Sequence, residues 1–348
     1  MGACFSLPIK AENPTSEAVT QENESSDFCG RISSISGHQG QNLGTETDIL
    51  ECSSLKNFRF AVLQAATNNF HQDSMVAEDA FGCLFKGQIK NQALTFLTPG
   101  TRLIIAVKKL REYRSNCHEE FLAEIKYLTH LNHPNLVKLV GYCLEDEHRL
   151  LAYEFMAGGS LDNRLFMKNP SSQPLSWGNR MKIALDAAKG LAFLHSDEVN
   201  VIFRDFKSSS IFLSLNNDAK LYGLGLARNG PTGGEEHVFT RVMGITGYVA
   251  PEYAASGCLT AKCDVYAFGA VLFEIITSRR MKDVIHSAGK TSVKDWAIMK
   301  GQYLSIMDVE IEGQYSISGA EKAANLALQS QSQAEHASGC CSTGTASD

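Results

Sequence analysis

Charged side chains lie within apolar segments at several places in the chain. In the first of these segments, a lysine follows a small residue by two positions. In the segment IIAVKKL, the period of two that a strand imposes puts Ala106 and Lys108 on the same face. A small residue beside an ammonium group could admit a flat base and let the lysine reach its phosphates. Glu124 follows sixteen residues later, within a segment of helical periodicity. Taken alone, Lys108 at a strand end and Glu124 on a helix surface would more simply face solvent.

A second concentration of charge lies in the segment VIFRDFKSSSIFL, where Arg204, Asp205 and Lys207 stand among apolar residues. Burying such charges costs free energy unless they are paired or used in chemistry. Two further motifs, GYVAPEY and DVYAFG, follow later in the chain. None of these segments alone indicates a class of protein, but their order and spacing together do.

The segments around these residues show the periodicities of the elements that must position them. Alternating segments predict strands, and a recurrence of Leu and Ile at every third residue predicts a helix with one buried face. The predicted strands and helices are a short helix in 60–70, strands in 83–89, 103–110, 133–143 and 149–156, and helices in 118–131, 177–195 and 264–280. Strands followed by helices predict an α+β domain in two lobes.

The composition excludes several other classes of protein. The 348 residues are 44% hydrophobic and 20% charged, which excludes a wholly disordered chain, a collagen and a coiled coil. A net charge of −6 argues against nucleic acid as the main partner. The longest apolar stretch, 267–276, is interrupted by Glu274 and is far shorter than the roughly 20 residues of a membrane span. The ten cysteines lack metal-ligand spacing, which predicts reduced thiols.

Both ends of the chain differ in texture from the middle. Residues 1–57 are rich in Ser, Asn, Gln, Gly and Thr and show neither helical nor strand periodicity. Residues 329–348 are small and polar. Such segments cannot bury enough apolar surface to offset the entropy of ordering, so we predict a disordered arm and a disordered tail.

The series of motifs resembles the signature set of eukaryotic protein kinases, over about residues 58–328. The resemblance implies a two-lobed fold with an antiparallel sheet and one helix in an N-lobe (58–156) and a mainly helical C-lobe (157–328). It implies that Lys108 holds ATP phosphates with Glu124 as its partner, and that Arg204, Asp205 and Lys207 form the catalytic loop. The other positions that match the family are Gly82 in the phosphate loop, Ala106 in the nucleotide pocket, Tyr153 as gatekeeper, Glu154 to Met156 as the adenine-contacting hinge, Ala250–Glu252 at the end of the activation segment, and Asp264 as the anchor of the catalytic loop.

The chain resembles more closely the plant receptor-like cytoplasmic kinases, a Pelle-related Ser/Thr branch of that family. The resemblance rests on the segments NHPNLVKLVGYCLEDEHRLLAYEFMAGGSL, FRDFK, LARNGPT and RVMGITGYVAPEY. Members of this branch are Ser/Thr protein kinases, which implies ATP as cofactor and signalling proteins as partners.

The departures from the family pattern fall on the chemistry. Where a working phosphate loop has three glycines, AEDAFG keeps only Gly82 and has Ala77 and Asp79 at the other two positions. Glycine allows close approach of the backbone, and a carboxylate there would repel triphosphate. The two positions that hold Mg²⁺ in kinases are Ser210 and Gly223, which offer a weak hydroxyl ligand and no side chain at all. We therefore expect no metal site.

The activation segment also departs from the family. Ile245 occupies the position of a threonine that contacts the catalytic loop, and the hydroxyl is displaced to Thr246. Thr240 is retained, and in kinases of this type the arginine that matches Arg204 pairs with a phosphate on this segment. No arginine follows Arg280 to pair with Glu252, so we expect a truncated last helix and a weakened C-lobe.

These observations predict a catalytically impaired receptor-like cytoplasmic kinase that acts as a membrane-associated scaffold or decoy in plant receptor or immune signalling. The alternative is a weakly active ATP-dependent Ser/Thr kinase, with Asp205 orienting the substrate hydroxyl and ATP bound with weak or no dependence on Mg²⁺. A third alternative is the poorly folded product of a decayed gene. The expected partners are receptor kinases or other signalling proteins at the membrane, and not nucleic acid.

The amino terminus, MGACFS, fits the pattern for N-myristoylation at Gly2, with Ser6 at the required position. One myristoyl chain binds membrane only marginally, so stable anchoring needs a second signal. Cys4 is well placed for palmitoylation. We therefore expect the chain at the cytoplasmic face of the plasma membrane, against the alternative that the Met-Gly start is coincidental.

The two lipid signals can be separated by substitution. A carboxyl-terminal fluorescent fusion should label the plasma membrane, Gly2→Ala should release it to the cytosol, and Cys4→Ser should leave it partly bound, because one chain anchors only marginally. Fluorescence microscopy and membrane fractionation measure the distribution. A Gly2→Ala protein that stays fully at the membrane would contradict lipidation at this site.

Overall fold

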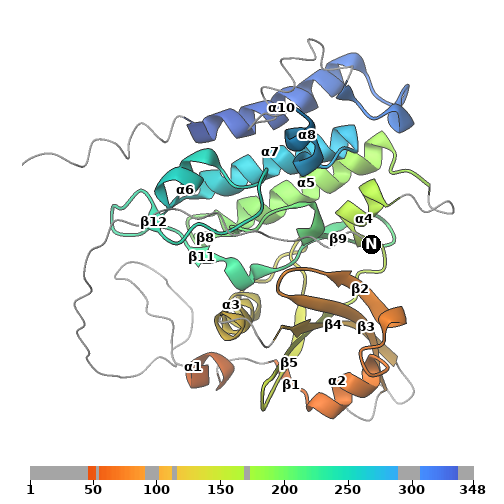
Figure 1. Cartoon of the computed structure of the whole chain (residues 1–348), viewed down its shortest axis with the longest axis vertical. Helices are drawn as coiled ribbons and strands as arrows, with labels where there is room; N and C mark the ends of the chain where they lie inside the picture. Colours follow the sequence, from red (N-terminus) through yellow and green to blue (C-terminus); the bar gives the residue numbers. More distant parts are fainter. Residues whose placement is uncertain are drawn as a thin grey trace, which may run out of the picture.

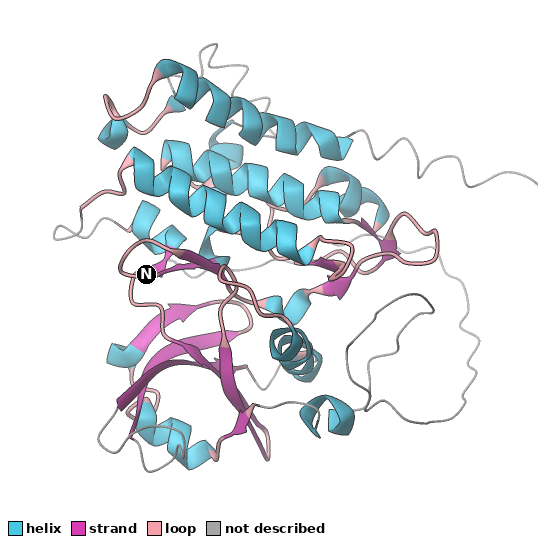
Figure 2. Ribbon diagram, turned by 180° about the vertical axis from the view of Figure 1, so that it is seen from behind, coloured by secondary structure: helices cyan, strands magenta, loops and turns pink. Residues whose placement is uncertain are grey.

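The computed structural model describes residues 46–51, 55–90, 102–111, 116–167, 173–288 and 306–335. A β-sheet with two flanking helices forms one lobe, and a stack of helices forms the other (Figure 1). Seen from behind, the strands of the sheet lie below the long helices, and loops connect the two parts (Figure 2). The two-lobed fold implied by the kinase resemblance is confirmed.

The N-lobe sheet has six strands in the order β1-β5-β6-β4-β3-β2. Its strands are β1 (Lys56–Asn57), β2 (Met75–Glu78), β3 (Gly82–Lys90), β4 (Arg102–Leu110), β5 (Leu139–Glu145) and β6 (His148–Glu154). All neighbours are antiparallel except β1 and β5. Within this register Lys108 on β4 lies between Leu84 and Leu151. The lysine is thus at the centre of the sheet, next to the loop that joins β2 and β3.

Two helices of the N-lobe, α2 (Phe60–Ala66) and α3 (Cys117–His130), match the helical segments predicted from the sequence. Leu122, Ile125 and Leu128 form the buried face of α3, as their spacing predicts. The first turn of α3 carries Glu119 and Glu120, whose charge suits the positive end of the helix dipole. Helix α3 therefore presents Glu124, also buried, toward the interior between the lobes.

The prediction that residues 1–57 form a disordered arm is wrong for part of this range. Helix α1 (Glu46–Glu51) lies beside α3, where the carboxylate of Glu46 is 3.1 Å from Nε2 of His118. Strand β1 extends the sheet by pairing in parallel with β5. Short polar segments of this kind are ordered by contacts with distant elements, and local periodicity does not record such contacts. Residues 1–45 and 52–54 lie outside the described residues.

The C-lobe is built from helices that pack around α7. Figure 1 shows α5, α7 and α10 stacked side by side, and α7 lies in the middle of the stack. The helices of this lobe are α4 (Leu161–Phe166), α5 (Trp177–Leu194), α6 (Pro251–Ser256), α7 (Ala261–Thr277), α8 (Met281–Ala288) and α10 (Ile317–Glu335). The apolar sequence of α7 is explained by this position, because the helix is covered on nearly every side.

Short strands of the C-lobe hold the loops that face the N-lobe. They are β7 (Gly159–Ser160), β8 (Val201–Ile202), β9 (Ile211–Leu213), β10 (Ala219–Leu221), β11 (Arg228–Asn229), β12 (Val238–Phe239) and β13 (Cys258–Leu259). Strand β9 pairs with β7 and β10, β8 with β11, and β12 with β13. The single-turn 3₁₀ helices are η1 (Gln72–Ser74), η3 (Ser208–Ser210), η4 (Leu224–Leu226) and η6 (Val309–Ile311).

The prediction of a disordered tail from residue 329 is also wrong in part, because α10 continues to Glu335. Ser330 and Gln331 are buried against α7. A Cβ at Gly269 of α7 would lie only 2.7 Å from the carbonyl oxygen of Ala327, so glycine allows the two helices to approach closely. The stripe of α10 that faces α7 consists of small residues, which made a packed helix look like a polar tail. Residues 336–348 lie outside the described residues.

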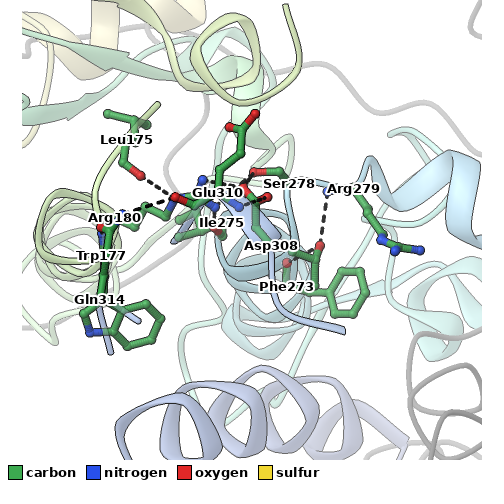
Figure 3. Close-up of polar contacts among 11 residues, drawn as sticks. Leu175, Trp177, Arg180, Phe273, Ile275, Ser278, Arg279, Asp308, Glu310 and Gln314 are labelled. Carbon is green, nitrogen blue, oxygen red and sulfur yellow. Dashed lines mark hydrogen bonds and ion pairs between the residues drawn. The ribbon is translucent and has the colours of Figure 1, made fainter. Parts of the chain in front are cut away.

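A buried arginine joins the segment that begins at residue 306 to the rest of the C-lobe (Figure 3). Arg180 of α5 donates to the carbonyl oxygens of Leu175 and Ile275, and its guanidinium lies 2.5 Å from the Asp308 carboxylate. Ser278 donates to the same carboxylate. A buried charge needs such partners, since leaving one unmatched costs about 3–5 kcal/mol. The network therefore binds α5, α7 and the approach to α10 together.

None of the helices in the described ranges has both the length and the apolar character needed to cross a bilayer.

Helix α7 also contains a buried carboxylate that links it to the activation segment. Glu274 accepts hydrogen bonds from the Tyr248 hydroxyl (2.6 Å) and the Met281 amide (2.8 Å). Burial raises the pKa of Glu274 to about 7, although these two donors, the Ser208 hydroxyl and the charge of Arg280 oppose the rise. The unfolded chain releases this proton near pH 4.5, whereas the folded chain keeps it to about pH 7.

Folding stability should therefore fall between about pH 4.5 and 7, because only the unfolded state has lost its proton in that range. The effect is of the order of 3 kcal/mol, about half the stability of a small domain. Glu274→Gln stays neutral and can still accept both hydrogen bonds, so its stability relative to wild type should rise as the pH is raised from 5 to 8.

Thermal unfolding at several pH values measures this difference. Glu321→Gln, at an exposed position of α10, is the matched control and should show no such trend. A Glu274→Gln protein whose stability relative to wild type is the same at pH 5 and pH 8 would show that Glu274 does not titrate in this range.

Candidate nucleotide and catalytic site

The catalytic-loop residues lie in the turn between β8 and η3, and a buried aspartate holds their backbone. Asp264 accepts hydrogen bonds from the amides of Phe203 and Arg204, each at 2.7 Å. It also lies 2.7 Å from Nε2 of His195. Arg204 has a φ of +71°, a conformation that costs free energy for a residue with a side chain. The Asp264 bonds compensate this cost, so the predicted anchoring role of Asp264 is confirmed.

Asp205 and Lys207 lie together at the cleft between the lobes. The Lys207 ammonium is 2.6 Å from the Asp205 carboxylate, and both side chains are largely buried. Ser210 donates its hydroxyl hydrogen to the Asp205 carbonyl oxygen at 2.9 Å. The base and the lysine that the kinase resemblance implies are thus next to each other.

The side chain of Arg204 extends from this loop to the activation segment. It donates to the hydroxyl of Tyr253 (3.1 Å), the hydroxyl of Thr240 (2.9 Å) and the carbonyl oxygen of Arg241 (2.5 Å). Arg204 is 8% exposed, and its second terminal nitrogen has no hydrogen-bond partner among the residues that the structure describes. The structure therefore brings Arg204 and Thr240 together, whereas Thr246 lies exposed elsewhere on the segment.

Lys108 is buried, which excludes the simple interpretation of a lysine facing solvent. Its ammonium lies 3.5 Å from the carboxylate of Asp79 and close to the rings of Phe81 and Tyr222. Ala106, on the same strand face, lines the adjoining cavity as predicted. The phosphate-binding lysine of the family pattern is therefore paired with a residue of the phosphate loop itself.

The phosphate loop is folded into a tight turn around the Asp79 side chain. One carboxylate oxygen accepts the amides of Phe81 (2.7 Å) and Gly82 (2.8 Å), and the other faces Lys108. A Cβ at Gly82 would clash with the carbonyl oxygen of Lys109, so this position requires glycine. The sequence predicted that Asp79 would repel phosphate. The structure shows in addition that it engages the amides of this turn.

The charges around Asp79 keep it ionised. Burial raises the pKa of this carboxyl, but the positive charges of Lys108 and Lys207 and the amides of Phe81 and Gly82 outweigh burial and hold the pKa below its usual range. Burial lowers the pKa of Lys108, but the neighbouring carboxylate of Asp79 is the largest of the charges that raise it, and the pKa lies above its usual value. Both partners therefore carry full charge at neutral pH.

Glu124 is buried on α3 but does not form the ion pair with Lys108 that the kinase resemblance implies. Among the described residues, the ion pair of Lys108 is with Asp79, and Glu124 instead accepts a hydrogen bond from the amide of Leu224 at 3.2 Å. The expected ion pair between Lys108 and Glu124 is therefore corrected, because Lys108 pairs with the carboxylate of Asp79 instead. Burial is the main reason that the pKa of Glu124 is raised.

The positions that would hold Mg²⁺ do not fit the ion. Gly223, in a left-handed conformation with φ of +98°, contributes no oxygen from a side chain. The Ser210 hydroxyl is already bonded to the backbone of the catalytic loop. Within the described ranges, no group of three His, Cys, Asp or Glu residues is placed to hold a metal. Since Mg²⁺ requires carboxylate oxygens, these residues offer too few ligands for it.

The cavity where an adenine ring would lie is narrow. Its walls include Ala106, Leu84, Val76, Val137, Glu154, Met156 and the aromatic rings of Tyr153, Phe212 and Tyr222. The volume of the cavity is about 10 Å³, which is about the space that one water molecule needs. The ring centroid of Tyr222 lies 5.0 Å from those of both Tyr153 and Phe212.

Glu154 and Met156 of the predicted hinge line this cavity, and so do Phe212 and Tyr222, which were not predicted to lie here. Both are aromatic residues near predicted positions, since Tyr222 precedes Gly223 and Phe212 follows Ser210 by two residues. Their bulk was the available signal. The Glu154 carboxylate accepts hydrogen bonds from the Lys220 ammonium (2.6 Å) and the Lys138 amide (2.8 Å). This carboxylate is therefore engaged with protein groups.

Comparison with known proteins agrees with the two-lobed kinase fold. Residues 70–304 match the family model described as protein tyrosine and serine/threonine kinase. The chain is 49% identical to "Receptor-like cytoplasmic kinase 176" of Oryza sativa subsp. japonica over 94% of its own length and 84% of that protein. It is 50% identical to "Probable serine/threonine-protein kinase PBL10" of Arabidopsis thaliana, over 94% and 81% of the two chains. It is 48% identical to "Serine/threonine-protein kinase BIK1" of Arabidopsis thaliana, over 94% and 84%.

The fold, the order of the motifs and these matches define a protein kinase domain. The chain belongs to the protein kinase family and, within it, is similar to the receptor-like cytoplasmic kinases of plants. The predicted lipidation sites, Gly2 and Cys4, lie outside the described residues.

Proposed function

We propose that this chain is a catalytically impaired receptor-like cytoplasmic kinase that works through its surface rather than through phosphate transfer. The observation that carries the proposal is the state of the phosphate site. Lys108, which would hold ATP phosphates, is paired with Asp79, and Gly223 has no side chain to hold a metal ion. Charge neutralisation by Mg²⁺ and lysine is the main source of catalysis in phosphoryl transfer, so both losses bear on the same step.

The magnitudes support impairment. Losing one preorganised electrostatic contact to a transition state typically lowers the rate by about 10²- to 10³-fold. Such losses are not additive, but two metal ligands and the phosphate loop together could exceed roughly 10⁴-fold. Kinases typically turn over about 1 to 100 times per second, so the remaining rate would scarcely count as catalysis.

The second candidate is a weakly active ATP-dependent Ser/Thr kinase, and the comparisons favour it, because the relatives are named as kinases. The Asp205–Lys207 pair also supports this candidate, since it is the part of the site that would orient a substrate hydroxyl. ATP would then be the cofactor, with weak or no dependence on Mg²⁺. The narrow adenine cavity and the Asp79–Lys108 pair speak for the first candidate.

We further propose that the chain acts at the cytoplasmic face of the plasma membrane, held by lipid on Gly2 and Cys4. Its partners would be receptor kinases or other signalling proteins, to which it presents a kinase-like surface as a scaffold or decoy. The support for this location is the amino-terminal pattern and the similarity to receptor-like cytoplasmic kinases. The buried network around Arg180 favours a folded protein over the product of a decayed gene.

Phosphate transfer distinguishes the two candidates. With purified full-length protein and a generic Ser/Thr substrate, wild type should transfer no more radiolabelled phosphate than the Asp205→Asn variant, with Mg²⁺ or Mn²⁺ present. The reason is that the metal has too few ligands, which Asp205→Asn does not change. Clear autophosphorylation that Asp205→Asn abolishes would establish the weakly active kinase instead.

The activation segment offers a test of the scaffold role. We expect an active membrane kinase to phosphorylate Thr240. The phosphate would add about 1.5 to 2 negative charges and strong acceptor oxygens. The buried guanidinium of Arg204, which contacts Thr240 and has one terminal nitrogen without a hydrogen-bond partner among the described residues, would bind it. The ordered segment should then recruit a partner. Pull-downs from plant membranes should recover less of that partner with Thr240→Ala and Arg204→Ala than with wild type.

Thr246→Ala is the matched control, because Thr246 is exposed on the same segment, whereas the hydrogen bonds from Arg204 to this segment go to Thr240 and Arg241. Mass spectrometry of the recovered wild type shows whether Thr240 carries phosphate. Recovery of the same partners in equal amounts by wild type and both variants would mean that no switch exists at Thr240.

A further inference from the structure

Positively polarised groups from three segments converge on the Asp79 carboxylate. The Lys108 ammonium comes from β4, at 3.5 Å, and the amides of Phe81 and Gly82 come from the loop before β3. Lys207, from the catalytic loop, lies near the same turn: its nitrogen is 6.0 Å from the ring centroid of Phe81, and it is paired with Asp205. Consecutive backbone amides beside ammonium groups are the arrangement that proteins use to bind anions such as phosphate.

We propose that Asp79 is an internal ligand of the anion site: its carboxylate fills the place that a polyphosphate would take between Lys108, Lys207 and the loop amides. Asp79 would thereby determine what this site binds, because it excludes polyphosphate without the help of any other molecule. This inference goes beyond the proposed function, since it concerns what fills the site and not whether the site transfers phosphate.

The surroundings of the pair strengthen the interaction. The ring centroid of Phe81 lies 5.7 Å from the Lys108 nitrogen and 6.0 Å from the Lys207 nitrogen, and the Tyr222 ring lies 5.2 Å from Lys108. Aromatic faces attract cations and also displace water. Charges shielded from water interact more strongly than charges on the surface. Lys207 is already paired with Asp205, whereas the ion pair of Lys108 among the described residues is with Asp79.

Competition with an external anion favours Asp79 because it belongs to the chain. A tethered group has an effective concentration in the millimolar range or above, whereas an external ligand must lose its translational freedom on binding. The turn from Asp79 to Gly82, closed by a bond from the Asp79 amide to the Gly82 carbonyl oxygen at 2.9 Å, also holds the carboxylate in place. A polyphosphate would have to displace a ligand that is already oriented.

Removing the charge of Asp79 while keeping its shape tests the proposal. Asp79→Asn can still accept the two loop amides, but it leaves Lys108 and Lys207 without this anion. The probe is inorganic tripolyphosphate, without metal, added to full-length protein during thermal unfolding. The melting temperature of Asp79→Asn should rise as tripolyphosphate is added. The tripolyphosphate concentration that gives half of this rise should be at least about tenfold lower for Asp79→Asn than for wild type.

Two further variants locate the effect. Asp218→Asn removes the carboxylate of the exposed ion pair between Lys182 and Asp218. This variant should respond to tripolyphosphate as wild type does. Lys108→Met in the Asp79→Asn background should abolish the gained response, because the main cation is gone. A response to tripolyphosphate that is equal in wild type and Asp79→Asn, whether present or absent in both, would overturn the proposal.

Folding of the variants is also informative. If Asp79→Asn does not fold alone, the proposal expects tripolyphosphate to restore folding, and it expects the double variant with Lys108→Met to fold without it. A double variant that also stays unfolded would show that Asp79 acts through the turn and not through charge, which would overturn the proposal. Phosphate transfer by wild type would overturn both the proposed function and the exclusion of polyphosphate by Asp79, whereas an equal response of wild type and Asp79→Asn to tripolyphosphate would overturn only the proposal about Asp79.

Discussion

A positive charge buried between two lobes must be balanced, and in this protein the balance at Lys108 comes from Asp79. The consequences extend through the site. The phosphate loop closes around the Asp79 carboxylate, Phe81 lies against both lysines of the cleft, and Glu124 is left to bond with the amide of Leu224. One ion pair thus decides the conformation of the loop and the role of the helix that faces it. Breaking such a pair is costly because the remaining charge stays buried.

The same constraint organises the C-lobe, with a different outcome. Arg180 is buried among α5, α7 and the segment that leads to α10, and Asp308 and two carbonyl oxygens satisfy it (Figure 3). Asp264 is satisfied by two backbone amides and so holds the strained turn at Arg204. These partners maintain the architecture of a protein kinase. Each of these buried charges therefore has the partners that it needs, and together they hold the C-lobe and the catalytic loop in place.

Family membership and activity are separate questions here. Identities near 50% to proteins named as kinases extend over 94% of this chain. Phosphoryl transfer depends in addition on a few oxygen atoms, and those at Gly223 and Ser210 are missing or already engaged.

The sequence by itself determined the fold class, the order of the motifs, the four longest strands, helices α2, α3, α5 and α7, and the identity of Ser210 and Gly223, because these follow from local periodicity and from residue identity. Tertiary structure decided the rest. Asp79 and Lys108 are 29 residues apart and meet only when β3 and β4 pair, so charge repulsion was foreseen but the ion pair was not. Phe212 and Tyr222 line the same cavity only because β9 and β10 pair, which brings their rings to within 5.0 Å of each other. Helix α10 is ordered past residue 329 because Gly269 allows a stripe of small residues to pack closely against α7, and such packing leaves no apolar signature in the sequence.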